Sequence, residues 1–290
     1  MDRTDPQKPE TALETFIEEV IRDFVRTSPL NRLESFGGAP IFTAPLVGFA
    51  SGEDPLFQTF KQVVHPDHFL PGEILQQATS AAVKDTSVIA FALPIHPETL
   101  RSNALQTEGP SLRWNHSRWQ GEIFAEALTR NLVAALEGAG GVGLAPALTP
   151  LFQVQRPPKP VASTWSQRHI AYAAGLGTFS LCDGFITSKG MGVWCGSVVT
   201  DLKLRPSEKP YGHHMANCRH HTTGKCGACV ARCPSGALSE EGHDKAKCME
   251  VLFIGQKPWL EGVHGPGYIG KYAGCGLCMT GVPCSDRIPS

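Results

Sequence analysis

Most of the cysteines of this chain are gathered near its C-terminal end. Of ten cysteines in 290 residues, eight lie at or after position 218. The first group reads Cys218-x7-Cys226-x2-Cys229-x3-Cys233-Pro234, and the second reads Cys248, then Cys275-x2-Cys278-x5-Cys284. Four thiolates hold a 4Fe–4S cluster, and a cysteine run that ends in Cys-Pro is typical of bacterial proteins with two clusters. The pattern therefore predicts two 4Fe–4S clusters and a role in electron transfer.

The spacing also assigns the ligands to the two clusters. In two-cluster proteins of this kind the cysteine before the proline binds the other cluster, so Cys233 is separated from the cysteines that precede it. The eight cysteines then fill two sites with none left over. We expect one cluster on Cys218, Cys226, Cys229 and Cys284, and the second on Cys233, Cys248, Cys275 and Cys278.

Two other uses of cysteine compete with this interpretation. Zinc is the stronger rival, because C-x2-C pairs also bind zinc and paired histidines lie nearby at positions 213–214 and 220–221. The Cys-Pro ending and the second cysteine group favour iron–sulfur instead. Disulfides would require an oxidising compartment, and residues 1–10 are polar without the pattern of a signal peptide. We therefore expect free thiols in the cytoplasm, with Cys182 and Cys195 as buried cysteines outside the clusters.

The composition bounds the class of protein. Apolar residues make up 41% of the chain, which is enough for a substantial core, and the length fits two domains of unequal size. We expect a disordered tail over residues 1–10, an α/β domain over 11–204 and a small cluster domain over 205–290.

The formal net charge of −1 disfavours nucleic acid as a partner. No apolar run approaches the roughly 18 residues of a membrane-spanning helix.

Hydrophobic periodicity predicts the elements of the larger domain. Residues 11–24 place their apolar positions on one helix face, with capping-box spacing between Thr11 and Glu14. A second helix over 119–136, between strands at 86–93 and 142–148, predicts a β-α-β unit, and a short strand is expected at 45–49. Thr164 is predicted to cap a helix over 165–174. Two apolar runs, 184–187 and 193–202, are expected to pair as a hairpin around the turn at 188–192.

Four stretches of the chain carry a resemblance to a known family. They are Ala173-Ala-Gly-Leu-Gly177, Gly196-Ser-Val-Val-Thr-Asp201, the run 226–238, and Tyr272-Ala-Gly-Cys-Gly-Leu-Cys278. In their order and separation they resemble the epoxyqueuosine reductase and reductive dehalogenase superfamily. The resemblance implies an α+β protein, in which a nitroreductase-like, corrinoid-binding α/β domain precedes a ferredoxin-like domain with two 4Fe–4S clusters.

The resemblance also implies cofactors and partners. Electrons would pass from a ferredoxin or flavodoxin-type donor through the two clusters to cobalamin, which would act on a small-molecule substrate. The corrin would pack on the region 174–201. Its implied contacts there are Gly175, Gly177, Thr178 and Ser180.

Two departures from the family pattern bear on the activity. Epoxyqueuosine reductases carry an acidic proton donor shortly before the Gly-Leu-Gly motif, and this chain has Val161-Ala-Ser-Thr164 in that place. Without a carboxyl group there, epoxide reduction lacks its general acid, and His169 on the following helix is the candidate proton donor. The spacing between Cys278 and Cys284 is also longer than the family's usual spacing.

The sequence leaves two hypotheses of different class. The first is a cytoplasmic oxidoreductase, in which electrons reach a bound corrinoid that reduces a substrate not identified by the sequence. The second is an electron carrier or activator, which reduces a partner corrinoid protein or enzyme and has no substrate of its own. The second hypothesis would explain the missing acid.

Overall fold

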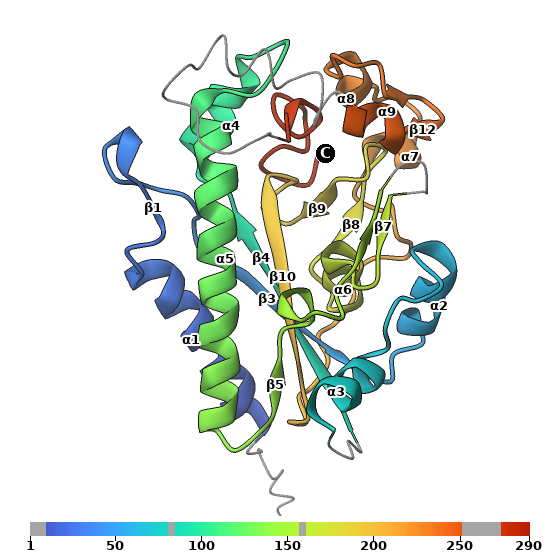
Figure 1. Ribbon diagram of the computed structural model, residues 1–290. Helices are drawn as coiled ribbons and strands as arrows, with labels where there is room; N and C mark the ends of the chain where they lie inside the picture. Colours follow the sequence, from blue (N-terminus) through green and yellow to red (C-terminus); the bar gives the residue numbers. More distant parts are fainter. Residues whose placement is uncertain (1–9, 81–84, 157–160, 251–273) are drawn as a thin grey trace, which may run out of the picture.

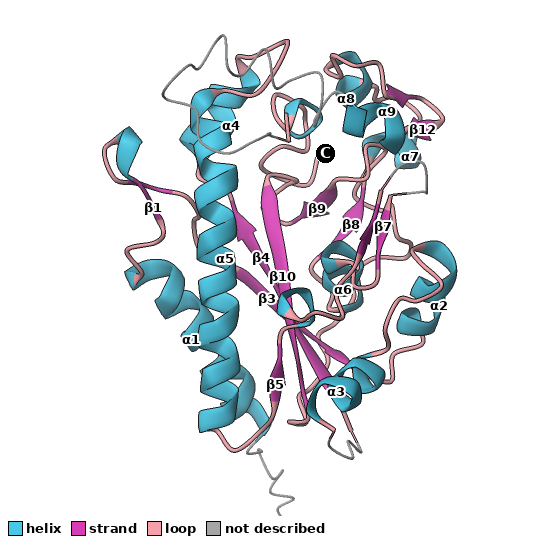
Figure 2. Ribbon diagram, in the orientation of Figure 1, coloured by secondary structure: helices cyan, strands magenta, loops and turns pink. Residues whose placement is uncertain are grey.

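The computed structural model describes residues 10–80, 85–156, 161–250 and 274–290 (Figure 1). The tail expected over residues 1–10 lies outside these ranges except for Glu10, where the first helix begins. Helices and strands are mixed along the chain (Figure 2), so the mixed α/β character predicted from the sequence is confirmed. Within the described ranges no helix combines the length and the apolar character that a membrane span requires.

The helices are α1 (Glu10–Thr27), α2 (Leu56–Val63), α3 (Pro71–Thr79), α4 (Pro97–Ala104), α5 (Leu112–Gly138), α6 (Gln167–Ala173), α7 (Arg219–Thr223), α8 (Ala228–Ala231) and α9 (Lys245–Glu250). Short 3-10 helices are η1 (Glu34–Phe36), η2 (Pro146–Leu148) and η5 (Leu277–Met279). The strands are β1 (Arg32–Leu33), β2 (Ala39–Pro40), β3 (Leu46–Ser51), β4 (Ser87–Pro94), β5 (Gly143–Leu144), β6 (Val154–Gln155), β7 (Ala162–Ser163), β8 (Gly177–Phe179), β9 (Phe185–Thr187), β10 (Val193–Thr200), β11 (Leu238–Ser239) and β12 (Gly242–His243).

A four-stranded sheet forms the centre of the molecule, with the strand order β3-β4-β10-β5. Each neighbouring pair of strands is antiparallel. Because β10 lies antiparallel to both β4 and β5, those two strands run parallel to each other on either side of it. The predicted β-α-β unit is therefore present as β4-α5-β5, with β10 inserted between its two strands.

Alternate residues of β4 face two different layers of helices. Ile89, Phe91 and Leu93 belong to a core shared with α1 and α5, whereas Val88 and Ala90 belong to a core shared with α2, α3 and α6. Successive side chains of a strand point to opposite faces of the sheet, which explains why this strand is buried along its whole length. In Figure 1 the two groups of helices lie on opposite sides of the sheet. The result is a three-layer α/β/α arrangement.

The long helices and the first strands are confirmed where the sequence predicted them. The helices expected over 11–24 and 119–136 are α1 and α5, and the strands expected at 45–49 and 86–93 are β3 and β4. Helix α5 begins earlier than predicted, because the Ser111 hydroxyl oxygen accepts a hydrogen bond from the Trp114 N–H at 3.1 Å. This side-chain cap satisfies one of the free N–H groups at the helix start.

Three local predictions are wrong. The strand expected over 142–148 is present only as the short strand β5, because Pro146 begins a 3-10 helix. The hairpin of 184–187 with 193–202 does not form: β9 pairs with β8, whereas β10 pairs with β4 along its whole length and with β5 at Val199 and Thr200. Thr164 does not cap α6, whose N-cap position is Ser166. The Thr164 hydroxyl instead accepts a hydrogen bond from the Gln153 N–H at 3.0 Å.

Candidate metal centre

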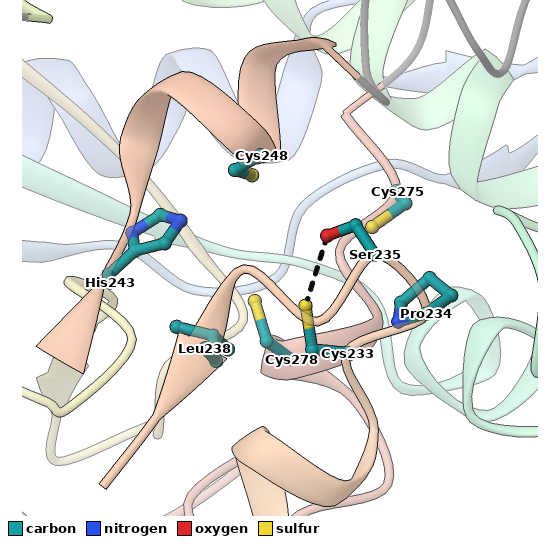
Figure 3. Close-up of a pocket in the computed structure, with 8 residues that line it drawn as sticks. All are labelled: Cys233, Pro234, Ser235, Leu238, His243, Cys248, Cys275 and Cys278. Carbon is teal, nitrogen blue, oxygen red and sulfur yellow. Dashed lines mark hydrogen bonds between the residues drawn. The ribbon is translucent and has the colours of Figure 1, made fainter. Parts of the chain in front are cut away.

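Four cysteines that were predicted to share one cluster line a single cavity, here named the Cys248 cavity (Figure 3). Its lining consists of Cys233, Pro234, Ser235, Leu238, His243, Cys248, Cys275 and Cys278. Cys233 follows α8, Cys248 lies in α9, and Cys275 and Cys278 share the C-terminal segment; in Figure 3 the four side chains lie around a common space. The cavity, including its opening, has a volume of about 350 Å³.

The other four predicted ligands line a second cavity of about 340 Å³, here named the Cys284 cavity. The sulfur-bearing side chains in its wall are Cys182, Met191, Cys218, Cys226, Cys229 and Cys284. The structure thus brings together the members of each predicted set. The Cys284 cavity also contains a fifth cysteine, Cys182, which the sequence placed outside the clusters.

Short helices position the cysteines of the first group. Cys218 occupies the N-cap position of α7, Cys229 lies within α8, and Cys233 follows α8 after a single residue. Gly224 ends α7 with a φ of 67°. That left-handed conformation favours glycine, and it lets the chain turn back so that Cys226 enters the same cavity as Cys218.

The C-terminal segment is docked by the backbone of the turn between β9 and β10. The Met191 N–H donates a hydrogen bond to the Cys284 carbonyl oxygen at 2.7 Å, and the Gly192 N–H donates to the Ser285 carbonyl oxygen at 3.0 Å. These bonds place Cys284 in its cavity although its spacing from the preceding cysteine is longer than the family pattern. The turn at 188–192 is therefore a docking site for the segment that carries Cys284.

The α/β part of the chain holds the loop around Cys275. The fully buried amide of Asn103 donates to the Cys275 carbonyl oxygen at 3.0 Å, and the Trp114 indole N–H donates to the Gly274 carbonyl oxygen at 2.7 Å. Gly276 follows with a φ of 61°, and a Cβ on it would collide with the Trp114 ring. Helices α4 and α5 thus fix the backbone from which Cys275 reaches the Cys248 cavity.

The chemistry of both cavities suits a cluster. Around one zinc ion, with Zn–S bonds of about 2.3 Å, the four sulfurs lie within about 4 Å of one another. Among the described residues, no group of three or more His, Cys, Asp or Glu side chains is arranged to hold a single metal ion. Each cavity instead has four predicted ligand thiols in its wall, with Cys182 as a fifth thiol in the Cys284 cavity, and soft thiolate ligands are those that iron–sulfur clusters use. The eight cysteines therefore fit two 4Fe–4S clusters.

Several of these thiols have a raised pKa in the metal-free protein, among them Cys248, Cys275 and Cys284, for which burial is the main cause. Burial, reinforced by neighbouring thiols, raises the pKa of Cys248 and of Cys284 to about 12. Iron binds cysteine as the thiolate, so cluster assembly releases these protons.

The four residues that were expected to contact a corrin are occupied within the protein. A Cβ on Gly175 would collide with the Glu208 carbonyl oxygen, and one on Gly177 would collide with the Ile186 carbonyl oxygen. The buried Thr178 hydroxyl accepts a hydrogen bond from the Asn217 N–H at 2.9 Å, and Ser180 lines the Cys284 cavity. Gly177, Thr178 and Ser180 are buried, so contact of this set with cobalamin stays a prediction, and we assign no step to cobalamin through these residues.

His169, the candidate proton donor, lies inside an aromatic cluster. Its ring centroid is 5.2 Å from that of Phe60 and 4.6 Å from that of Phe179, and its Nδ1 lies 2.8 Å from the Ser166 hydroxyl. Burial lowers the pKa of His169 from 6.5 to about 3. The ring is therefore neutral at pH 7, which counts against the role of proton donor.

The depressed pKa of His169 predicts a pH dependence of stability. The unfolded state binds a proton below pH 6.5 and the folded state does not, so the stabilisation present above pH 6.5 is lost as the pH falls toward 3. In His169→Gln the slope of the unfolding free energy against pH should be smaller by up to about 1.4 kcal/mol per pH unit. We expect the urea midpoint to fall less between pH 7.5 and 5.5 than in the unaltered protein. His214→Gln replaces an exposed histidine and is the control, which should behave like the unaltered protein. An equal fall of the urea midpoint in His169→Gln and in the unaltered protein would contradict the prediction.

Cys182 is the residue of this region that the sequence did not identify. It lies in the turn between β8 and β9, is 5% exposed and lines the Cys284 cavity, and its Sγ lies 3.8 Å from the Cys278 carbonyl oxygen. No spacing motif connects it to the C-terminal cysteines. The contact arises only because the turn packs against the cluster region.

Comparisons with known proteins identify the fold. No family model and no curated protein match the chain. Among solved structures, an epoxyqueuosine reductase from Streptococcus thermophilus matches with a TM-score of 0.55 and 13% identity, over 95% of this chain and 67% of the other. An epoxyqueuosine reductase with a tRNA-Tyr epoxyqueuosine-modified tRNA stem loop matches with a TM-score of 0.50 and 15% identity, over 95% of this chain and 66% of the other. The resemblance to epoxyqueuosine reductases is confirmed at the level of the fold, and the chain spans about two thirds of their length.

One expectation from the composition is corrected by these comparisons. The near-zero net charge was taken to disfavour nucleic acid as a partner, yet a protein of the same fold was solved with a tRNA stem loop. Net charge sums over the whole surface, whereas an RNA contact needs cations only where the phosphates lie. The argument from net charge against nucleic acid is therefore wrong for this fold.

Proposed function

We propose that the protein is a cytoplasmic iron–sulfur oxidoreductase, in which two 4Fe–4S clusters pass single electrons to an acceptor bound by the α/β part of the chain. One cluster would be held in each four-cysteine cavity, where it would store one electron at low potential. Residues 205–290 would form a ferredoxin-like domain and residues 11–204 a nitroreductase-like domain. None of the ten cysteines is in a disulfide, so all eight predicted ligands have a thiol that can bind iron.

The observation that carries this proposal is the separation of eight cysteines into two adjoining cavities of four. The cavities adjoin, because Cys182 lines the Cys284 cavity and its Sγ lies 3.8 Å from the carbonyl oxygen of Cys278, which lines the other cavity. Two redox centres so close together can exchange electrons directly. The backbone that carries Cys275 is bonded to α4 and α5 of the α/β part, which supports electron delivery toward that part of the chain.

The substrate class that we propose to test first is a modified tRNA. One protein of the same fold was solved with an epoxyqueuosine-modified tRNA stem loop, and reduction of such an epoxide consumes two electrons and two protons. Cobalamin is the acceptor that the family resemblance implies, but the residues named for it are packed within the protein. Binding of cobalt by the whole protein is therefore the quantity to measure before any step is assigned to a corrin.

A second function is favoured by one observation. The stretch 161–164 holds no carboxyl group, and His169 is neutral at pH 7 because burial lowers its pKa to about 3. A protein without a general acid at this place would still transfer electrons. Delivery of electrons to a partner corrinoid protein or enzyme is therefore the alternative to a reductase with its own substrate.

The test is anaerobic reconstitution of the full chain with iron, sulfide and cobalamin, followed by desalting and assay of iron, sulfide and cobalt. About eight irons with about one cobalt per chain are expected for a corrinoid reductase. That preparation is then reduced and incubated with an epoxyqueuosine-modified tRNA stem loop, and the product is measured by mass spectrometry. About eight irons without cobalt would favour the electron carrier, and zinc in place of iron would overturn both functions.

A further inference from the structure

The Arg232 side chain lies where two cysteine-bearing segments meet the end of α4. It directly precedes Cys233 in the chain, and its Nε–H donates a hydrogen bond to the Leu277 carbonyl oxygen at 3.0 Å. Its Nη2 donates to the carbonyl oxygens of Gln106 at 3.1 Å and of Asn103 at 3.4 Å. One guanidinium group thus joins three segments that are far apart in the sequence.

These contacts connect Arg232 to the wall of the Cys248 cavity. Leu277 is followed by Cys278, and the side-chain amide of Asn103 donates to the Cys275 carbonyl oxygen at 3.0 Å. Cys233, Cys275 and Cys278 all line this cavity. Arg232 is therefore bonded at or next to the backbone of three of its four predicted ligands.

The guanidinium of Arg232 is a fixed positive charge. In the described part of the chain its acceptors are carbonyl oxygens, and no carboxylate is paired with it. Asn103 belongs to the last turn of α4, where the helix dipole favours a cation. Gly281 closes off another side, because a Cβ on it would lie 3.3 Å from the Arg232 Cζ. Arginine stays protonated at every pH at which the protein is folded, so the charge is present throughout.

We propose that Arg232 is a positioning residue that joins two ligand-bearing segments of the Cys248 cavity to α4, and that its charge raises the reduction potential of the cluster in this cavity. Reduction adds one negative charge to the cluster, and a nearby cation stabilises that charge. Arg232 is partly buried, so salt screens its charge less than it screens an exposed one. The inference rests on the proposed function, because it requires a cluster in this cavity.

The test compares the reduction potentials of reconstituted full-length variants, by redox titration followed by electron paramagnetic resonance. Arg232→Gln removes the charge but keeps a hydrogen-bond donor, so it should retain about eight irons and shift one potential to a more negative value. Arg232→Lys keeps the charge but loses the planar fork of donors. Its potentials should stay close to those of the unaltered protein, while its thermal midpoint falls.

Two further variants make the comparison specific. The matched control is Arg130→Gln, which removes a guanidinium from α5 that is 67% exposed and should leave both potentials unchanged. Cys248→Ala removes one ligand from the Cys248 cavity, whose wall holds no fifth thiol. The signal that Cys248→Ala abolishes therefore belongs to the cluster in this cavity, and it should be the signal that Arg232→Gln shifts.

Each other outcome overturns the inference. Unchanged potentials in Arg232→Gln would show that the charge does not act on a cluster, and an equal shift in Arg232→Lys would assign the effect to the hydrogen bonds. A shift confined to the signal that remains in Cys248→Ala would place the charge beside the other cluster. If Arg232→Gln loses iron, Arg232→Met, which is also uncharged, is measured in its place. Fewer than about eight irons in the unaltered protein would instead refute the proposed function.

Discussion

Replacement of Cys229 with alanine is expected to lower the iron content of the reconstituted protein from about eight to about four atoms per chain. Cys229 lines the Cys284 cavity with three other predicted ligands, and a 4Fe–4S cluster with three thiolates has one iron without a protein ligand. The Cys248 cavity keeps its four cysteines, so the second cluster should remain. Iron and sulfide assays, together with the spin count of the reduced protein, measure the loss.

Two further variants show whether a change in iron content is specific to the loss of Cys229. Cys195→Ala removes a cysteine outside both cavities and should retain about eight irons. Because Cys182 lies in the same cavity, it could take the place of Cys229 as a ligand, and the double variant Cys182→Ala/Cys229→Ala tests this substitution. About four irons in the double variant, with about eight in Cys229→Ala, would show replacement by Cys182. About eight irons in both would refute the ligand assignment.

The cysteine sets were predictable because their information is local in the sequence. The C-x2-C-x3-C-Pro run identifies three ligands in one short segment. The cysteine before the proline binds the other cluster, and this rule assigns the remaining cysteines to the two clusters. The same reasoning found β4, whose eight residues are buried on both faces, because a fully buried strand reads as a continuous apolar run. Local patterns therefore predicted the grouping of cysteines that line each cavity.

The failures share a physical cause, which is contact between segments far apart in the chain. The run at 184–187 pairs with β8, and the strand that was expected to pair with it, β10, pairs along its whole length with the distant β4. The docking role of the turn at 188–192 depends on the distant C-terminal segment. Cys182 reaches the Cys284 cavity through a turn whose own sequence contains no motif. The pairing of β10 with β4 and the docking of the C-terminal segment join residues far apart in the sequence, and local patterns do not predict such contacts.

Replacement of Gly190 with alanine is expected to release the C-terminal segment and to remove one cluster. Gly190 has a φ of 81°, and a Cβ on it would collide with the backbone nitrogens of Asp286 and Arg287. Left-handed strain and the clash together should cost about 2–5 kcal/mol of unfolding free energy. The neighbouring Met191 N–H holds the Cys284 carbonyl oxygen at 2.7 Å, so displacement of this segment withdraws Cys284 from its cavity.

Gly37→Ala is the matched control for that substitution, because Gly37 also has a positive φ, 68°, but no atom lies within 4 Å of a Cβ built on it. It should lower stability by the backbone strain alone, about 1–2 kcal/mol, and retain about eight irons. In Gly190→Ala the thermal midpoint should fall further and the iron content should approach about four. Equal iron in the two variants would show that docking of the C-terminal segment is not required for the cluster, and Cys284 would then lose its place among the ligands. The cluster would in that case have to take its fourth thiolate from Cys182, the remaining cysteine of the same cavity.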